Sequence, residues 1–174
     1  MPTSVKGALE LRKALRKFTP DLAKETTKEI GTFLKPVVRN ARGFIPANEQ
    51  VPSGWLVGNQ KGKWQRAAFD STIAKRGIGY KTTPTKVNRY GFRALVSILN
   101  KSAGGSIYEI AGIRSGVKGN FTPRLGGELA GKGSKMTGRA MYRAWAEDQG
   151  KAKGAVLKAI FNSADKFNKA TGVK

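Results

Sequence analysis

Apolar residues recur every three or four positions at both ends of the chain. This spacing predicts a short amphipathic helix over residues 5–18 and a longer one over 20–42. Pro20 suits the first position of the longer helix, and Pro36 should bend it or mark a joint. Residues 139–170 show helical spacing again, interrupted by Gly150 and Gly154, so two helices or one bent helix are expected there.

The middle of the chain has strand-like and glycine-rich patterns instead. Residues 77–83 and 92–99 are predicted strands, residues 100–105 a turn, and residues 106–110 the returning strand. Two long segments, 46–70 and 113–137, are rich in glycine and have few core residues. We expect them to be mobile in the isolated subunit and ordered by neighbours in an assembly.

Together these patterns predict an α+β fold. A long N-terminal helix and a C-terminal helix should pack on a small antiparallel β-sheet, with long extended loops. The chain is expected to form one domain over residues 1–174. Its expected parts are a helical part (1–45), an extended arm (46–70), a β-sheet (71–112), a Gly-rich basic loop (113–137) and a C-terminal helical part (138–174).

The large excess of basic residues indicates which kinds of partner the protein could bind. The 174 residues include 33 Lys and Arg but 11 Asp and Glu, a net charge of +22. Such an excess attracts polyanions, whether nucleic acid or acidic protein surfaces. No apolar stretch is long enough to span a bilayer and the N-terminus lacks a signal-peptide core, so no membrane partner is expected.

The sequence does not favour a catalytic function. It contains no His and no Cys, which removes the commonest general base, thiol chemistry and the usual zinc ligands. The run 126–132 matches G-x-x-x-x-G-K, but Gly133 stands where a hydroxyl must bind magnesium. Gly77-Ile78-Gly79 is half of a dinucleotide fingerprint, with Thr82 at the third glycine position. A non-enzyme without cofactor or metal is therefore expected, and a phosphate-handling enzyme has only the broken loop in its favour.

The basic residues of the loops are the candidate contacts. We expect them to bind nucleic acid or an acidic partner through charge, without reading sequence. The candidates are Lys61, Lys63, Arg66, Lys75, Arg76, Arg114, Lys118, Arg124, Lys132, Lys135 and Arg139. Trp55 and Trp64 lie among them and are expected to be core or interface anchors, with base stacking as the weaker alternative.

Four segments of the sequence carry a resemblance. They are Leu34-Lys35-Pro36-Val37-Val38-Arg39-Asn40-Ala41-Arg42-Gly43-Phe44-Ile45-Pro46, Ser53-Gly54-Trp55-Leu56, Ile107-Tyr108-Glu109-Ile110-Ala111-Gly112 and Gly138-Arg139-Ala140-Met141-Tyr142-Arg143-Ala144-Trp145. In this order they resemble the tail-completion (neck, or head–tail connector) proteins of long-tailed phages, the siphophages. In that family the Tyr-Glu segment belongs to a strand.

The resemblance implies a structural virion protein. It would form a homo-oligomeric ring, six-fold like the tail, between the head-completion proteins and the tail terminator, around the DNA path. Its expected partners are the neighbouring neck and tail-terminator proteins, with channel DNA as a further candidate. Its expected location is the virion (neck and tail), after assembly in the host cytoplasm. The competing hypothesis is a cellular nucleic-acid-binding protein of ribosomal or nucleoid type that reads no sequence. The native complex of the protein would discriminate the two.

Overall fold

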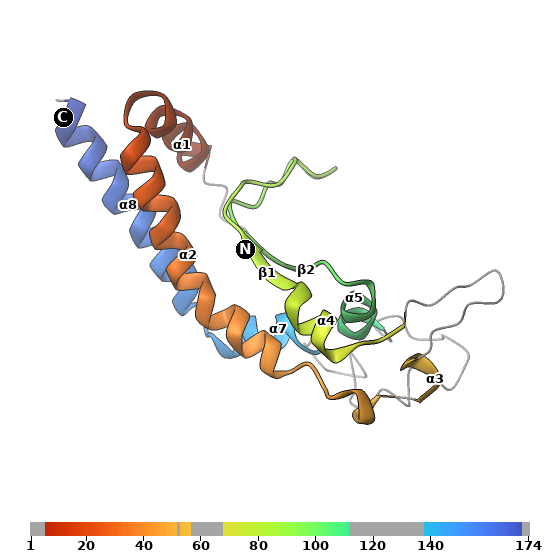
Figure 1. Cartoon of the computed structure of the whole chain (residues 1–174). Coiled ribbons are helices and arrows are strands. Elements are labelled where there is room, and N and C mark those ends of the chain that lie inside the picture. The colour runs from red at the N-terminus through yellow and green to blue at the C-terminus, as the bar shows by residue number, and fades with distance from the viewer. Residues whose placement is uncertain (1–5, 52, 57–67, 112–137, 172–174) are drawn as a thin grey trace. The chain divides into compact units, whose positions relative to one another are not determined.

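The computed structural model describes residues 6–51, 53–56, 68–111 and 138–171, and Figure 1 shows the order of their elements. The helices are α1 (Lys6–Phe18), α2 (Pro20–Gly43), α3 (Ser53–Leu56), α4 (Ser71–Gly77), α5 (Ala103–Ile110), α7 (Met141–Glu147) and α8 (Lys151–Thr171), with a 3-10 turn at Asn48–Gln50. Strands β1 (Ile78–Lys81) and β2 (Ser97–Asn100) pair in a two-stranded antiparallel sheet. The predicted α+β class is confirmed.

The chain divides into two compact units. Unit 1 draws on residues 1–36, 80–97 and 150–174, and unit 2 on residues 37–79 and 98–149. The expectation of one domain stays a prediction. About half of the predicted arm (residue 52 and residues 57–67) and all of the predicted Gly-rich loop (residues 113–137) lie outside the described residues, and so do the expectations attached to those residues. The described part of the arm contains the 3-10 turn Asn48–Gln50 and helix α3, so it is not extended throughout as predicted.

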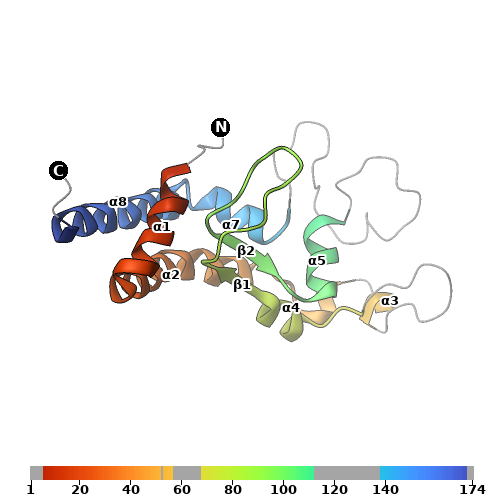
Figure 2. The same cartoon turned by 90° about the horizontal axis from the view of Figure 1, so that it is seen from above.

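Unit 1 is built on two antiparallel helices. The first part of α2 and the helix α8 lie side by side (Figures 1 and 2) and bury Ile30, Leu34, Val156, Ala159 and Ile160 between them. Partly buried residues from α1, α2, β1 and the chain before β2 pack against this cluster: Leu11, Phe33, Tyr80, Leu95 and Val96. The predicted packing of the long helix and the C-terminal helix beside the sheet is therefore confirmed.

A buried polar pair fixes the register of these helices. The hydroxyl oxygens of Thr26 and Ser163 lie 2.6 Å apart, so that one hydroxyl donates to the other. Each also lies within hydrogen-bond distance of a backbone carbonyl one turn earlier in its own helix, and the hydroxyl that accepts across the pair can donate there. At the surface, the Lys166 ammonium donates to the Glu25 carboxylate at 2.8 Å. Buried hydroxyls need partners, so this pairing disfavours a shift of one helix along the other.

The C-terminal helical part is two helices rather than one. Between α7 and α8 the backbone of Gln149 has φ 52° and that of Gly150 has φ +82°. Both values lie in the left-handed region, which interrupts a right-handed helix and which glycine adopts without strain. Pro36, in contrast, lies inside α2, which continues to Gly43.

Two predicted strands are corrected, one in each unit. Residues 106–110 belong to helix α5, not to a returning strand, and residues 92–96 precede the short strand β2 rather than forming part of it. Helix α5 begins at a capping serine, because the Ser102 hydroxyl accepts the Gly105 N–H at 3.0 Å. A Cβ on Gly104 would lie 2.8 Å from the Ala68 carbonyl oxygen, so glycine allows α5 to lie close to the backbone of Ala68 and Phe69. Tertiary packing thus overrides the low helix propensity of the two glycines.

Two glycine substitutions should change stability in opposite directions. Gly154 is exposed in α8 and a Cβ there would meet nothing within 4 Å. Gly154→Ala should raise the free energy of unfolding by about 0.5–1 kcal/mol, because alanine has less backbone freedom to lose. A Cβ on Gly31 would lie 2.7 Å from the Tyr80 hydroxyl, so Gly31→Ala should lower stability by displacing that ring. Urea unfolding of both variants checks this, and a stabilising Gly31→Ala would contradict the packing described.

Candidate nucleic-acid interface

Most of the predicted contact residues lie outside the described residues. These are Lys61, Lys63, Arg66, Arg114, Lys118, Arg124, Lys132 and Lys135, together with Trp64. The structure places four of the predicted site residues: Lys75, Arg76, Arg139 and Trp55. All four belong to unit 2.

Lys75 and Arg76 occupy the last turn of α4. Cations are favourable there because the unpaired carbonyl groups at a helix C-terminus carry partial negative charge. Arg76 is exposed and Lys75 is half-buried. These two side chains keep the surface position that a contact with a polyanion requires.

Arg139 lies in the interior of unit 2, with 8% of its surface exposed. Its Nη1 donates to the carbonyl oxygens of Tyr108 at 2.8 Å and Ala111 at 2.7 Å, at the C-terminal end of α5. Burial lowers the pKa of Arg139 from its ordinary value, with smaller opposing contributions from Tyr108 and Glu109. An arginine stays charged even so. Arg139 therefore caps the C-terminal end of α5 and is not an exposed contact residue.

Glu109 makes the reciprocal connection. Its side chain is buried, and its two carboxylate oxygens accept the backbone N–H groups of Ala140, Met141 and Tyr142, each at 3.0 Å. These donors lie at the start of α7, where no side chain of the helix itself provides a cap. Glu109 and Arg139 thus join the end of α5 to the start of α7, and sequence spacing gives no sign of this pair.

Trp55 is a core residue of unit 2. It has 0% of its surface exposed, and its ring centroid lies 4.8 Å from that of Phe69. The Phe69 N–H also donates to the Trp55 carbonyl oxygen at 2.9 Å. Within the subunit, Trp55 serves as a core anchor, one of the two roles expected of it.

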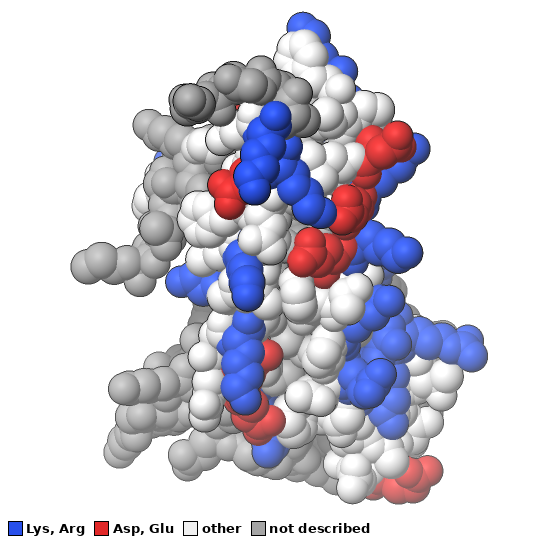
Figure 3. Space-filling model, turned by 90° about the vertical axis from the view of Figure 1, so that its left-hand side faces the viewer, with Lys and Arg blue, Asp and Glu red and all other residues white. Residues whose placement is uncertain are grey.

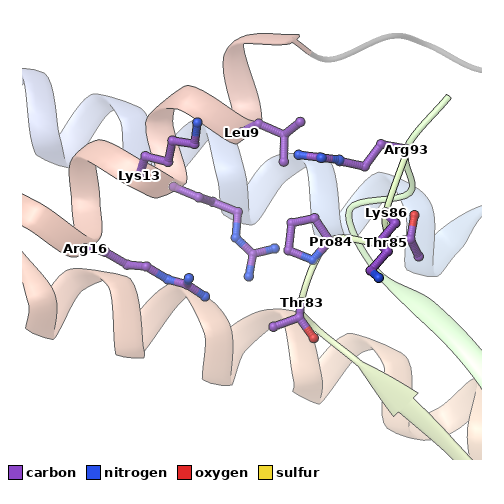
Figure 4. A pocket seen from close by; sticks show the side chains of 9 residues that line it. Leu9, Lys13, Arg16, Thr83, Pro84, Thr85, Lys86 and Arg93 are labelled. Carbon is purple, nitrogen blue, oxygen red and sulfur yellow. The ribbon is translucent and has the colours of Figure 1, made fainter. Parts of the chain in front are cut away.

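Unit 1 holds a basic pocket of about 360 Å³ that the sequence did not predict. On one side α1 contributes residues 9–16, and on the other the connection between β1 and β2 contributes residues 83–93. Figure 4 shows Arg93 extending toward Leu9, with Pro84 central among the labelled side chains. The lining consists of Leu9, Arg12, Lys13, Arg16, Thr83, Pro84, Thr85, Lys86 and Arg93. Five of these nine residues are basic and none is acidic.

Arg12 ties the two sides of the pocket together. Its Nη1 donates to the Leu95 carbonyl oxygen at 3.3 Å, which joins α1 to the chain just before β2. Burial lowers the pKa of Arg12 from its ordinary value, and the positive charge of Arg16 lowers it further. The two guanidinium groups therefore repel each other, and an anion between them would relieve that repulsion.

The connection between β1 and β2 is an ordered hairpin, which we call the basic hairpin (residues 82–96). At its base the Thr85 N–H donates to the Ala94 carbonyl at 2.9 Å, and the Thr85 hydroxyl accepts the Ala94 N–H at 3.0 Å. At its tip the Asn88 side-chain oxygen accepts the N–H groups of Tyr90 and Phe92 at 3.0 and 2.8 Å. Gly91 has φ +74°, which the tight turn requires. The hairpin thus has a fixed conformation of its own.

This hairpin displays basic and aromatic side chains to solvent. Tyr90 is 76% exposed, and the Arg89 guanidinium carbon lies 4.6 Å from the centre of its ring. Lys86, Phe92 and Arg93 are exposed as well. Basic side chains also predominate over acidic ones on the face of the molecule shown in Figure 3.

None of the five pocket cations is among the contacts predicted from sequence. The sequence does indicate one side of the pocket, since Arg12 and Arg16 are four residues apart and share one face of a predicted helix. The cations of the other side, Lys86 and Arg93, lie about 70 residues further along the chain. Only the folded structure brings the two segments together.

The described helices include none that is both long enough and apolar enough to cross a membrane. Within the described residues no group of three or more His, Cys, Asp or Glu is placed to hold a metal ion.

The chain was compared with protein-family models, curated proteins and solved structures, and it matches none of them.

Proposed function

We propose that this chain is a non-enzymatic structural protein of the neck of a long-tailed phage. In this proposal copies of the chain form a ring, six-fold like the tail, between the head-completion proteins and the tail terminator. The ring surrounds the DNA path and completes the tail for joining to the head.

The order of the elements is the observation that carries this proposal. A long N-terminal helix with an internal proline is followed by a small antiparallel sheet and a C-terminal helical part, as the resembled family has them. One segment departs from that pattern, because Tyr108 and Glu109 lie on helix α5 rather than on a strand.

The charge of the chain fits a place beside DNA or acidic neighbours. A ring of subunits that each carry +22 repels itself unless a polyanion compensates it. Packaged DNA and acidic faces of adjoining rings both meet that need. Nothing in this role requires a general base or a thiol, and the chain has neither His nor Cys.

A cellular nucleic-acid-binding protein of ribosomal or nucleoid type is the second candidate. The basic pocket favours it equally, because five cations without a carboxylate among them suit any nucleic-acid backbone. The two candidates differ in the complex that holds the protein, not in the chemistry of its surface.

Locating the native complex tests the proposal. Antibodies against the chain would be applied to gradient-purified phage particles and to ribosome and nucleoid fractions of uninfected source cells. We expect the protein in the particles, with gold label at the junction of head and tail, and a six-membered ring by native mass spectrometry. Absence from the particles together with sedimentation among ribosomes or nucleoids would support the cellular candidate instead.

A further inference from the structure

We propose that the basic pocket of unit 1 binds the sugar–phosphate backbone of nucleic acid, with one phosphate held among Arg12, Arg16 and Arg93. Unlike the predicted loop contacts, this site lies wholly within described residues of one compact unit. It is independent of the phage assignment, since neck DNA and cellular nucleic acid share the same backbone.

The arrangement of the charges supports an anionic ligand. Arg12, Lys13 and Arg16 line the pocket from α1, while Lys86 and Arg93 line it from the basic hairpin. Guanidinium groups present paired N–H donors that match two oxygens of one phosphate. The hydroxyl groups of Thr83 and Thr85 add donors on the hairpin side.

The size and apolar surface of the pocket favour a ligand larger than a free phosphate ion. A volume of about 360 Å³ falls at the small end of the range for pockets that hold organic ligands. Leu9 and Pro84 line it between the cations. A sugar ring can cover these apolar side chains while its phosphate meets the charges.

The hairpin gives a reason to prefer nucleic acid to an acidic protein segment. Tyr90 and its stacked neighbour Arg89 are exposed on the hairpin that also supplies Lys86 and Arg93. An exposed aromatic ring beside basic residues can stack on a base, an interaction that a run of carboxylates does not offer. An ordered hairpin with this composition therefore indicates a nucleic-acid ligand.

A matched pair of charge variants tests the site. The pocket variant carries Lys13→Gln, Arg16→Gln and Arg93→Gln, and leaves Arg12 with its structural bond in place. The control variant carries Lys28→Gln, Lys153→Gln and Lys158→Gln, three exposed positions on α2 and α8 that do not line the pocket. Each variant removes three positive charges. Binding to a short DNA duplex, a single strand of matched length, poly-glutamate and inorganic phosphate is measured across salt concentrations, after circular dichroism has verified folding.

We expect the pocket variant to weaken binding of at least one DNA form about tenfold or more at low salt. Its logarithmic salt slope should fall by about 0.9 for each duplex phosphate that the variant no longer neutralises. The control should change far less, and a variant with Arg16→Lys and Arg93→Lys should recover much of the affinity. Whichever DNA form loses more affinity identifies the strand type that enters the pocket.

Three results would overturn the proposal. Equal weakening by the pocket and control variants would show that net charge alone matters. Loss of poly-glutamate binding with unchanged DNA binding would assign the pocket to an acidic protein. Binding of inorganic phosphate in the pocket with no effect of the variant on DNA would leave only a small-anion site.

The site can also be tested on the wild-type protein, where the result does not depend on whether a variant folds. Lys13 and Lys86 line the pocket from its two sides, whereas Lys153 and Lys158 lie on α8 outside it. DNA should slow acetylation of Lys13 and Lys86 relative to Lys153 and Lys158, as read by mass spectrometry. Equal protection of all four would contradict the site.

Discussion

Glu109→Ala is expected to lower the free energy of unfolding by about 3 kcal/mol or more. The variant removes a buried carboxylate, 2% exposed, that accepts three backbone N–H groups at the start of α7. Hydrogen bonds to a charged group contribute more than neutral ones, and donors left buried without a partner add their own desolvation cost. Urea unfolding followed by circular dichroism measures the change.

A carboxylate at the end of α7 provides the control. Glu147 pairs with Arg143 at 2.9 Å, but both side chains are about half exposed, and such surface pairs contribute little. Glu147→Ala should therefore cost less than about 1 kcal/mol. Similar losses in the two variants would show that the Glu109 cap does not hold α7 in place.

Trp55→Ala is expected to lower the stability of the isolated subunit by about 3–5 kcal/mol. Its indole is fully buried and packs on Phe69 within unit 2, so the variant leaves a large cavity. Trp55→Phe should retain part of the stability because it keeps an aromatic contact. Unfolding is measured at a concentration low enough to keep the subunit monomeric.

The same variant separates the two roles expected of this tryptophan. A core anchor is needed in the monomer, whereas an anchor between subunits matters only in the ring. Unchanged monomer stability combined with failed assembly would assign Trp55 to an interface and contradict the packing seen in unit 2.

Periodic apolar positions predicted the long helices well. The stripe through Ile30 and Leu34 and the stripe through Val156 and Ile160 meet in one buried cluster, and the boundaries of α1 and α2 differ by about one residue from those expected. Such stripes are reliable because a helix must bury its apolar face against something. The two φ > 0 residues before α8 likewise agree with the glycine signal at that point.

Short elements could not be predicted because distant contacts decide them. Residues 106–110 read Ser-Ile-Tyr-Glu-Ile, which suits a strand, yet the Ser102 cap and the packing of α5 on α4 make them helical. Helix α4 was missed although Asp70 caps it, with its carboxylate accepting the Ile73 N–H at 2.8 Å. A capping residue alone is too common in loops to identify a helix of seven residues.

The candidate site was less predictable than the fold. The sequence identified the excess of positive charge correctly, but charge has no periodicity that tells which cations will share a pocket. Arg139 shows this most clearly. It was predicted as a surface contact because it lies in a basic stretch, yet its side chain is buried and donates to two carbonyl groups at the end of a helix. Conversely, Arg16 and Arg93 line one pocket only because α1 lies against the chain near β2.

The reciprocal caps of Glu109 and Arg139 have a consequence for how the chain tolerates changes in length. The Arg139 guanidinium bonds the Ala111 carbonyl, so the two flanks of residues 112–137 are held together by residues outside that segment. The scaffold therefore does not depend on the segment to close it. Doubling the length of a connection between two fixed ends raises its closure cost only by about 0.6 kcal/mol. A change in the number of residues between Ala111 and Arg139 should therefore cost little stability, because α5 and α7 stay joined by contacts on either side of that stretch.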